Sequence, residues 1–224
     1  MKVDYIHHCG SDLAVVNAAR VSFDKESEWL IDENGDICTG ELTNRDKKLI
    51  KYLATHDHHS PFNHSFVTMR VKAPIFVARQ LVKHKFMPWN EISRRYVDSE
   101  PEFYWPEKWR ARAEDKKQGS SCEEINFSPI EEEVYRLSSC SSISLYNQLL
   151  SRSVCPEQAR MVLPLNTYTE WYWSGTLGAW LDMLKLRLKD DTQQETREVA
   201  EQCADIIAGL FPVSYQTVIG DKSD

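Results

Sequence analysis

Several features that define common protein classes are missing from this sequence of 224 residues. No apolar run approaches the roughly 18 residues that a membrane-spanning helix needs. The first residues, MKVDYIHHCGSD, contain no apolar core of a secretion signal. Internal repeats and low-complexity tracts are also absent. These absences predict a cytoplasmic protein that has no membrane partner, and its length suits one domain or one and a half.

Cysteine pairs are missing as well, although six cysteines are present. None forms a CxxC pair, which argues against a disulfide framework and against a zinc knuckle. Cys155 precedes a helix-opening proline, so an inert role is favoured over a catalytic thiol. Ser93 lacks the strained Gly-x-Ser-x-Gly context of a serine nucleophile. The six positions are Cys9, Cys38, Cys122, Cys140, Cys155 and Cys203.

Positive charge is scarce overall, with 27 Lys and Arg against 34 Asp and Glu and a net charge of −7. Such acidity argues against general nucleic-acid binding, which favours a basic domain. Residues 70–95 are the exception, because seven Lys and Arg face only Glu91 and give a net +6. A one-signed block indicates an anionic partner, although a solvated helix end would carry the same charge.

The distribution of apolar residues and capping signals predicts an α+β chain. Sheet and helices share a first part over about residues 1–127, and a second part over about 128–212 is mostly helical. We expect strands at Phe66–Lys72 and Thr167–Trp173, after a short strand near the N-terminus. The polar segment 99–127 is expected to form a surface connection. Helices are expected at 12–20, 43–55, 74–85, 128–152 and 156–161, at 174–188, and from a cap at Thr192 to before Pro212, with a turn or hairpin at Asn34-Gly35.

The basic segment KHKFMPWNEISRR (83–95) concentrates groups that bind phosphate. Gln80, Lys83 and His84 are spaced i, i+3 and i+4, so they share one face of the expected helix. Ser93 and two arginines follow after a turn that Pro88 introduces. Arginine makes bidentate contacts to phosphate, and serine adds a hydroxyl. Among these cations, Glu91 either pairs structurally or recognises hydroxyl groups of a ligand such as a ribose.

Histidines gather in HDHHSPFNH (56–64), which offers ligand types suited to zinc or iron. Nothing elsewhere completes a metal-binding signature, so a loop of packed imidazoles is favoured. Arg160 and Arg187 lie in the apolar surroundings ARMVLPL and MLKLRL. Each needs exposure or an anionic partner, which is either a structural carboxylate or a ligand.

Taken together, these pieces resemble the flavin-dependent thymidylate synthases. His84 between Lys83 and Lys85, followed by seven residues and Ser93, has the spacing of that family's signature, Arg-His-Arg-x7-Ser. The resemblance extends in collinear order over about residues 10–212. It includes AARVSF (18–23), HSPF (59–62), VKAPIFVARQ (71–80), NEIS (90–93), RRY (94–96), VLPLN (162–166) and LKLR (184–187).

The resemblance implies a single domain over residues 1–224 with a mainly antiparallel sheet flanked by helices, and a homotetramer with shared active sites. It implies reductive methylation of dUMP to dTMP, with methylenetetrahydrofolate as the carbon donor and NADPH as the reductant through FAD. No metal and no enzymic cysteine nucleophile takes part in this chemistry. Reduced flavin supplies the hydride, while polarisation of the pyrimidine makes the ring receptive.

The resemblance also implies roles for individual residues. Arg187 is the catalytic residue, because it would stabilise the anionic pyrimidine. The nucleotide would be held by Gln80, Lys83, Glu91, Ser93, Arg94, Arg95, Arg187 and, from another subunit, Arg160. FAD would be held by His58, Ser60, Asn63, Lys83, His84, Lys85, Glu91, Thr176, Gly178 and Asp182.

The sequence departs from the family pattern at several of these positions. Lys83 and Lys85 keep the positive charge of arginine but lose its planar, bidentate fork. Thr176, Gly178 and Asp182 stand where the family commonly has asparagine and arginine. These departures leave one alternative open, a non-catalytic homologue that binds nucleotide and flavin.

Overall fold

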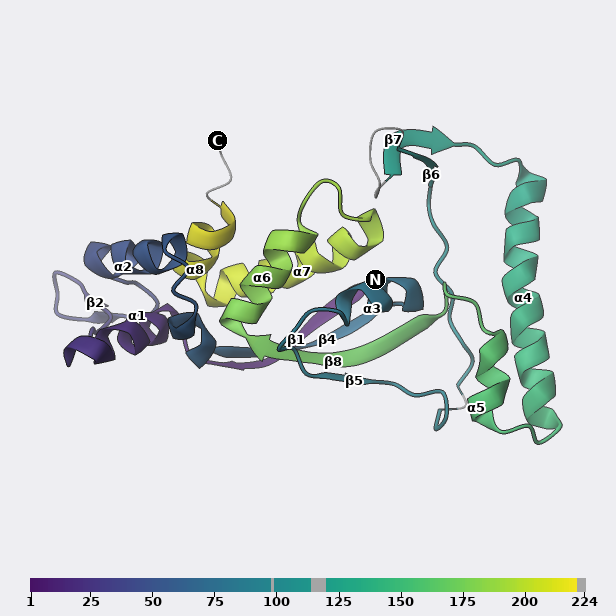
Figure 1. Ribbon diagram of the computed structural model, residues 1–224, viewed down its shortest axis with the longest axis horizontal. Coiled ribbons are helices and arrows are strands. Elements are labelled where there is room, and N and C mark those ends of the chain that lie inside the picture. Colours follow the sequence, from purple (N-terminus) through teal and green to yellow (C-terminus); the bar gives the residue numbers. More distant parts are fainter. Residues whose placement is uncertain (98, 114–119, 221–224) are drawn as a thin grey trace.

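The computed structural model describes residues 1–97, 99–113 and 120–220. A four-stranded antiparallel sheet in the order β1-β4-β8-β5 forms its centre (Figure 1). The two central strands pair over their full length, from Phe66 opposite Thr176 to Pro74 opposite Tyr168. The strands are β1 (Lys2–Cys9), β4 (Phe66–Pro74), β8 (Tyr168–Thr176) and β5 (Trp89–Glu91).

Three helices cover one face of this sheet (Figure 1). They are α3 (Ile75–Leu81), α6 (Leu177–Arg187) and α7 (Gln194–Leu210). Met69 of β4 lies opposite Trp173 of β8 in the register, and both are fully buried. Trp180 of α6 packs edge-on against Trp173, with ring centroids 4.9 Å apart, and its indole donates to the Val67 carbonyl oxygen. The core therefore lies between the sheet and these helices.

A second group of helices lies at one end of the sheet (Figure 1). Thr43 caps α2 as expected, because its side chain accepts from the Asp46 backbone N–H. The buried carboxylate of Asp12 accepts from the backbone N–H groups of Val213 and Ser214, which ties the C-terminal helix to α1. The elements here are α1 (Asp12–Arg20), η1 (Val21–Phe23), the hairpin β2 (Leu30–Ile31) and β3 (Ile37–Cys38), α2 (Asn44–Thr55), η2 (Ser60–His64), α8 (Pro212–Tyr215) and η4 (Gln216–Gly220).

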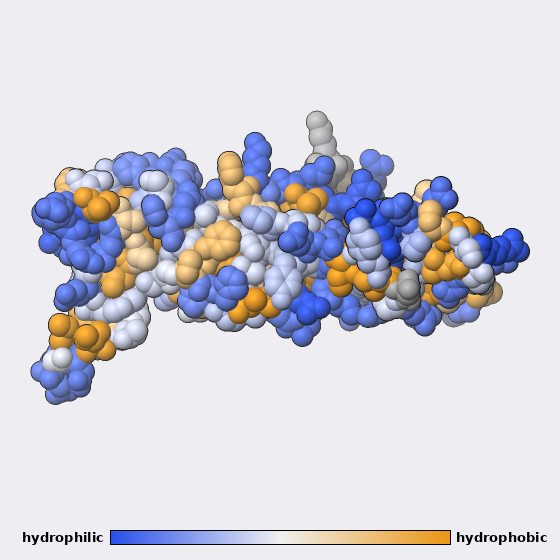
Figure 2. Space-filling model, turned by 90° about the horizontal axis from the view of Figure 1, so that it is seen from below, coloured by the Kyte–Doolittle hydropathy of each residue, from blue (hydrophilic) through white to orange (hydrophobic). Residues whose placement is uncertain are grey.

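The opposite end carries a long helix that stands apart from the sheet (Figure 1). Ser128 and Glu131 form a capping box at its start. Ile130, Val134 and Leu137 give it an apolar stripe that is more than half exposed. Apolar side chains lie among polar ones at this end of the surface (Figure 2). The elements here are β6 (Trp109–Arg112), β7 (Ser120–Ile125), α4 (Pro129–Ser151), α5 (Pro156–Ala159) and η3 (Arg160–Val162).

The predicted α+β class and the mainly antiparallel sheet are confirmed. The expected surface connection at 99–127 contains the hairpin β6–β7, and its residues 114–119 lie outside the described part. None of the helices in the described ranges is both long and apolar enough to cross a membrane.

Boundaries of α3, β8 and α7 were predicted wrongly. Pro74 is the N-cap of α3 rather than its first helical residue, and the helix ends at Leu81 instead of about Lys85. The predicted strand end at Trp173 is wrong, because β8 continues to Thr176, whose side chain then caps α6. Thr192 does not cap α7, because its hydroxyl donates to the Leu186 carbonyl oxygen instead.

Candidate functional site

Arg187, His84 and the end of α3 form one cluster, because α3 and α6 both end at the same side of the core. The Arg187 Nε donates to His84 Nε2 at 2.9 Å, and its Nη2 donates to the Gln80 carbonyl oxygen at 3.2 Å. Burial lowers the pKa of His84 to about 4, and the positive charge of Arg187 adds to this effect. His84 is therefore a neutral acceptor at pH 7, and it orients the guanidinium.

This cluster borders a hollow of about 520 Å³ that also has Lys83 and Gln193 in its wall. Arg79, Lys83, Arg187 and Lys189 bring four positive charges to it, against one carboxylate from Asp191. Such a one-signed lining favours an anionic ligand. The structure thus brings together the predicted nucleotide-binding residues Gln80, Lys83 and Arg187.

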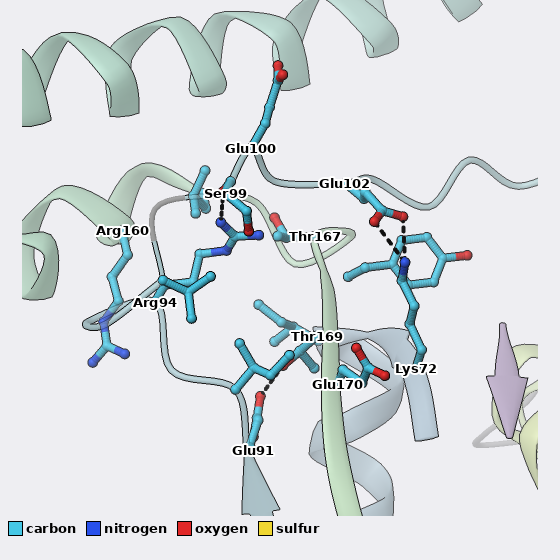
Figure 3. A pocket seen from close by; sticks show the side chains of 15 residues that line it. Lys72, Glu91, Arg94, Ser99, Glu100, Glu102, Arg160, Thr167, Thr169 and Glu170 are labelled. Atoms are coloured by element: carbon cyan, nitrogen blue, oxygen red, sulfur yellow. Dashed lines mark hydrogen bonds and ion pairs between the residues drawn. The ribbon is translucent and has the colours of Figure 1, made fainter. Parts of the chain in front are cut away.

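A second hollow, of about 240 Å³, lies between β5, β8 and the segment after β5 (Figure 3). Arg94 and Arg160 stand on one side of it, and Lys72 pairs with Glu102 on the other (Figure 3). Arg160 is exposed, and Arg94 donates to the Ser99 carbonyl oxygen. These arginines leave donors for a ligand, because a guanidinium carries five N–H groups.

Glu91 is held in the wall of this second hollow by two donors. The Thr169 hydroxyl donates to one of its carboxylate oxygens at 2.6 Å, and the Trp89 indole donates to the other at 3.0 Å. Sequence reasoning missed Thr169 as the partner of Glu91. No local pattern indicates this contact, since the two residues are 78 positions apart and meet only through strand pairing.

Ser93 and Arg95 lie in the turn that follows β5. The Arg95 Nε donates to the Ser93 hydroxyl oxygen at 3.1 Å. The Arg95 guanidinium also lies 4.9 Å from the centroid of the Tyr96 ring. Ser93 is half-buried and Arg95 is exposed, so both remain accessible beside the second hollow.

The residues predicted to hold flavin are split among the Arg187 cluster, the second hollow, which Glu91 lines, and a third hollow of about 490 Å³ at the start of α6. The Thr176 hydroxyl donates to Asn63 Oδ1 at 2.8 Å. A Cβ atom on Gly178 would approach that same oxygen to 2.6 Å, so glycine permits this close packing. His59, Phe86, Ala179 and Asp182 complete the lining.

The remaining predicted flavin residues lie around this third hollow. His58 lines a small adjoining space with Gly178 and Asp182. Ser60 is exposed in η2, and Lys85 is exposed next to Phe86 in the chain. Within the described ranges, no group of three or more His, Cys, Asp or Glu side chains is placed to hold a metal ion.

On a single chain, the predicted site is therefore divided among three hollows. Gln80, Lys83 and Arg187 line the first hollow, where His84 holds Arg187, and Glu91, Arg94 and Arg160 line the second. The two share no lining residue. Asn63, Thr176, Gly178 and Asp182 belong to the third.

Comparison with known proteins shows the family of the chain. The family described as thymidylate synthase complementing protein matches residues 4–213. Flavin-dependent thymidylate synthases of Thermus thermophilus and Kosmotoga olearia are both 37% identical, over 95% and 94% of this chain and 73% and 86% of their own lengths. A solved UMP/dUMP methylase, PolB from Streptomyces cacaoi bound with 5-Br dUMP, has a TM-score of 0.79 and 31% identity over 96% of this chain and 93% of that one. With the match spanning nearly the whole chain, the protein belongs to the thymidylate synthase complementing protein family.

Proposed function

We propose that the protein methylates dUMP reductively to dTMP, with methylenetetrahydrofolate as the carbon donor and NADPH as the reductant through FAD. The observation that carries this proposal is the Arg187 guanidinium held between His84 and the end of α3. This group is half-buried, fixed in orientation and open to the first hollow. It is suited to stabilise negative charge that develops on a pyrimidine ring.

Arg187 keeps enough donors for that role. Its contacts to His84 and Gln80 use two of the five N–H groups of a guanidinium, so three remain for the substrate. Burial lowers the pKa of Arg187 from its usual value. His84 is neutral, so its hydrogen bond with Arg187 brings no second positive charge next to the guanidinium. The carbonyl oxygens of uracil are acceptors that these donors fit, and the ring nitrogen between them accepts only when it has lost its proton.

The nucleotide phosphate and sugar fit the cationic groups around the second hollow. Arg94, Arg95 and Arg160 supply donors for phosphate oxygens, and Ser93 adds a hydroxyl. Glu91 offers acceptor oxygens for sugar hydroxyls while Thr169 and Trp89 fix its orientation.

We further propose a homotetramer with shared active sites. The nucleotide-binding residues of one chain border two separate hollows, so a second subunit would place the second hollow of one chain opposite the first hollow of another. The exposed apolar stripe of α4 at Ile130, Val134 and Leu137 supports burial against other subunits.

The third hollow fits a flavin. Its lining combines apolar surface from Phe86 and Ala179 with the polar groups of Asn63 and Thr176, and it lies at the N-terminus of α6. A helix N-terminus favours the phosphate groups that FAD carries, and Lys85 brings a positive charge nearby in the chain. When bound there, the flavin would supply the hydride for reduction of the transferred carbon.

A cysteine nucleophile has no place in this proposal. Of the five cysteines whose side chains the structure describes, none lines the three hollows. Cys203 is fully buried in α7, and burial raises the pKa of its thiol. Activation of the pyrimidine therefore rests on the hydrogen bonds of Arg187 rather than on covalent attack.

The test is a reconstitution with FAD, methylenetetrahydrofolate and NADPH, in which dTMP is measured by chromatography. Product should form from dUMP and should disappear when FAD, the folate or the reductant is left out. A parallel reaction with UMP is needed, because PolB is a UMP/dUMP methylase. Bound flavin with dUMP affinity but no turnover would refute the enzyme and favour the non-catalytic homologue.

A further inference from the structure

The side chain of Gln80 belongs to a polar chain that extends well beyond the first hollow. Its Nε2 donates to Gln193 Oε1, and its Oε1 accepts from the Thr196 hydroxyl at 3.2 Å. Gln193 Nε2 in turn donates to Glu195 Oε2 at 3.0 Å. Gln80 is thus held by the start of α7, which is 113 positions away in the sequence.

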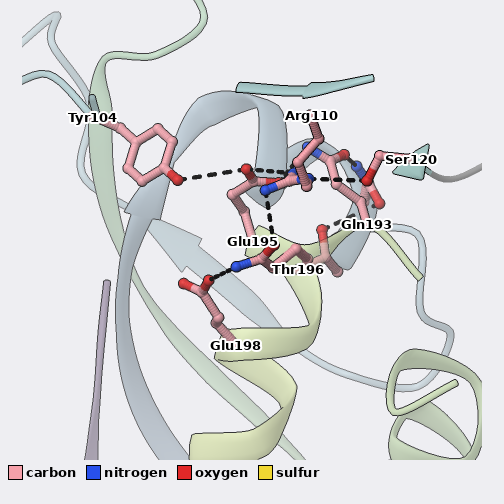
Figure 4. A network of polar contacts seen from close by, with 9 residues as sticks. Tyr104, Arg110, Ser120, Gln193, Glu195, Thr196 and Glu198 are labelled. Atoms are coloured by element: carbon pink, nitrogen blue, oxygen red, sulfur yellow. Dashed lines mark hydrogen bonds and ion pairs between the residues drawn. The ribbon is translucent and has the colours of Figure 1, made fainter. Parts of the chain in front are cut away.

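This row of hydrogen bonds ends at a buried ion pair between Arg110 and Glu195 (Figure 4). The Arg110 Nη2 donates to both carboxylate oxygens of Glu195, at 2.7 and 2.8 Å. Tyr104 approaches the same carboxylate from the other side, at 3.4 Å (Figure 4). The Glu195 side chain is only 6% exposed. Burial is the largest influence and raises its pKa. The hydrogen bonds from Arg110, from its own backbone N–H and from Gln193, with the charge of Arg110, together outweigh burial, so the pKa lies below its usual value and the anchor remains charged.

These contacts occupy only half of the hydrogen-bonding groups of the Gln80 amide. A primary amide has two N–H donors and two acceptor lone pairs. Gln193 and Thr196 use one of each, so one donor and one acceptor remain. Their direction is fixed, because both ends of the amide are held. Gln80 and Gln193 also lie in the wall of the first hollow, next to Arg187.

We propose that Gln193 is a positioning residue, which together with the Arg110–Glu195 anchor orients the Gln80 amide toward a bound nucleoside monophosphate. The hairpin β6–β7 and α7 thereby contribute to nucleotide affinity without touching the nucleotide. The inference rests on the proposed function, in which Gln80 contacts dUMP. It predicts that affinity depends on Gln193 only while the Gln80 amide is present.

Two adjacent glutamines allow a matched experiment. Gln194 has the same side chain as Gln193, but it accepts from Arg110 Nη1 and donates to Glu198, and it makes no contact with Gln80. We expect Gln193→Ala to weaken dUMP binding by about three- to tenfold, the loss of one neutral hydrogen bond. Gln194→Ala should change the dUMP dissociation constant less than about twofold. Calorimetric titration of the full-length protein with dUMP measures both, and thermal melting checks the fold.

A double-mutant cycle with Gln80→Ala separates the possible outcomes. If the inference is correct, Gln80→Ala weakens dUMP binding, and adding Gln193→Ala to it causes no further loss. If Gln80→Ala leaves the dissociation constant unchanged, the proposed contact of Gln80 with dUMP is wrong. If Gln80→Ala weakens binding and Gln193→Ala has no effect, or has the same additional effect in both backgrounds, the positioning role is overturned. A lower melting temperature of Gln193→Ala with unchanged dUMP affinity would also overturn it, because that result marks a purely structural residue.

Discussion

Protonation of His84 should break the contact that orients Arg187. The imidazole accepts a hydrogen bond from Arg187 Nε, and an imidazolium has no acceptor left. The pKa of His84 is lowered from 6.5 to about 4 in the folded chain, first by burial and then by the charge of Arg187. Between these two values the unfolded chain binds the proton more tightly than the folded chain.

The sign of the effect on stability follows from this difference. The stabilisation is complete above the unfolded pKa of 6.5, and it is lost as the pH falls toward the folded pKa of about 4. Integration of the linkage, discounted for the partial exposure of the ring, gives a loss of about 1–2 kcal/mol by about pH 5. His84→Gln is the matched variant, because its amide oxygen accepts from Arg187 and does not titrate.

The assay is urea unfolding of both proteins at about pH 7 and about pH 5. We expect the wild-type free energy of unfolding to fall by about 1–2 kcal/mol more than that of His84→Gln. The six other histidines are common to both proteins, so their titration cancels in the comparison. An equal loss in both proteins, or a His84 ring proton that titrates by NMR at its ordinary pKa, would refute the reasoning.

Three further predictions concern the proposed catalytic role of Arg187, the proposed flavin site in the third hollow and the core. Arg187→Lys should lower turnover by about two orders of magnitude with an unchanged melting temperature, because an ammonium cannot replace the fixed fork; near-normal turnover contradicts the assigned role. Gly178→Ala should reduce the flavin retained after purification, measured by visible absorbance, because the new methyl group displaces the asparagine 2.6 Å away. Gly209→Ala is its control, since nothing lies within 4 Å of a Cβ there. Trp180→Phe should cost about 1–3 kcal/mol in urea unfolding, because it removes a buried hydrogen bond to the main chain of β4. Trp171→Phe should cost less, because the described part of the chain offers its indole N–H no partner, and equal costs would contradict this account.

Local signals predicted the helix starts that depend on neighbouring residues. Thr43 caps α2 and Ser128 caps α4 with Glu131, as the spacing of these side chains indicates. Such caps depend on a hydroxyl and a backbone N–H two or three residues away. The information is therefore contained within one turn of sequence.

Boundaries that depend on strand pairing could not be predicted in this way. The end of β8 was placed at Trp173, but β4 offers partners up to Thr176, and the Thr68 and Ser174 hydroxyls lie 2.9 Å apart across the pair. The expected helix to about Lys85 stops at Leu81 because β5 must turn back to pair with β8. Phe86 adopts a φ of 61° in that turn.

In the candidate site, too, the sequence predicts the proximity of residues that are close in sequence but not the contacts between residues far apart in sequence. The Gln80, Lys83 and His84 spacing is local, so the sequence places the three residues close together. The contact of His84 with Arg187 spans 103 positions, and it exists only because α3 and α6 cover the same sheet face. Family resemblance named both residues, but the neutral state of His84 follows only from burial beside a guanidinium.

The two lysines of the signature can be assessed from this geometry. Lys83 lines the first hollow, yet the groups that fix direction there are the held guanidinium of Arg187 and the held amide of Gln80. Lys85 is exposed and precedes Phe86, which lines the third hollow, and a lysine there would attract phosphate as a point charge without a bidentate contact. Charge is therefore the property that positions 83 and 85 must supply, and a lysine retains it. Replacement of the two signature arginines by lysine removes two bidentate guanidinium groups. Other residues orient the ligand at these places, so the replacement is compatible with an active enzyme.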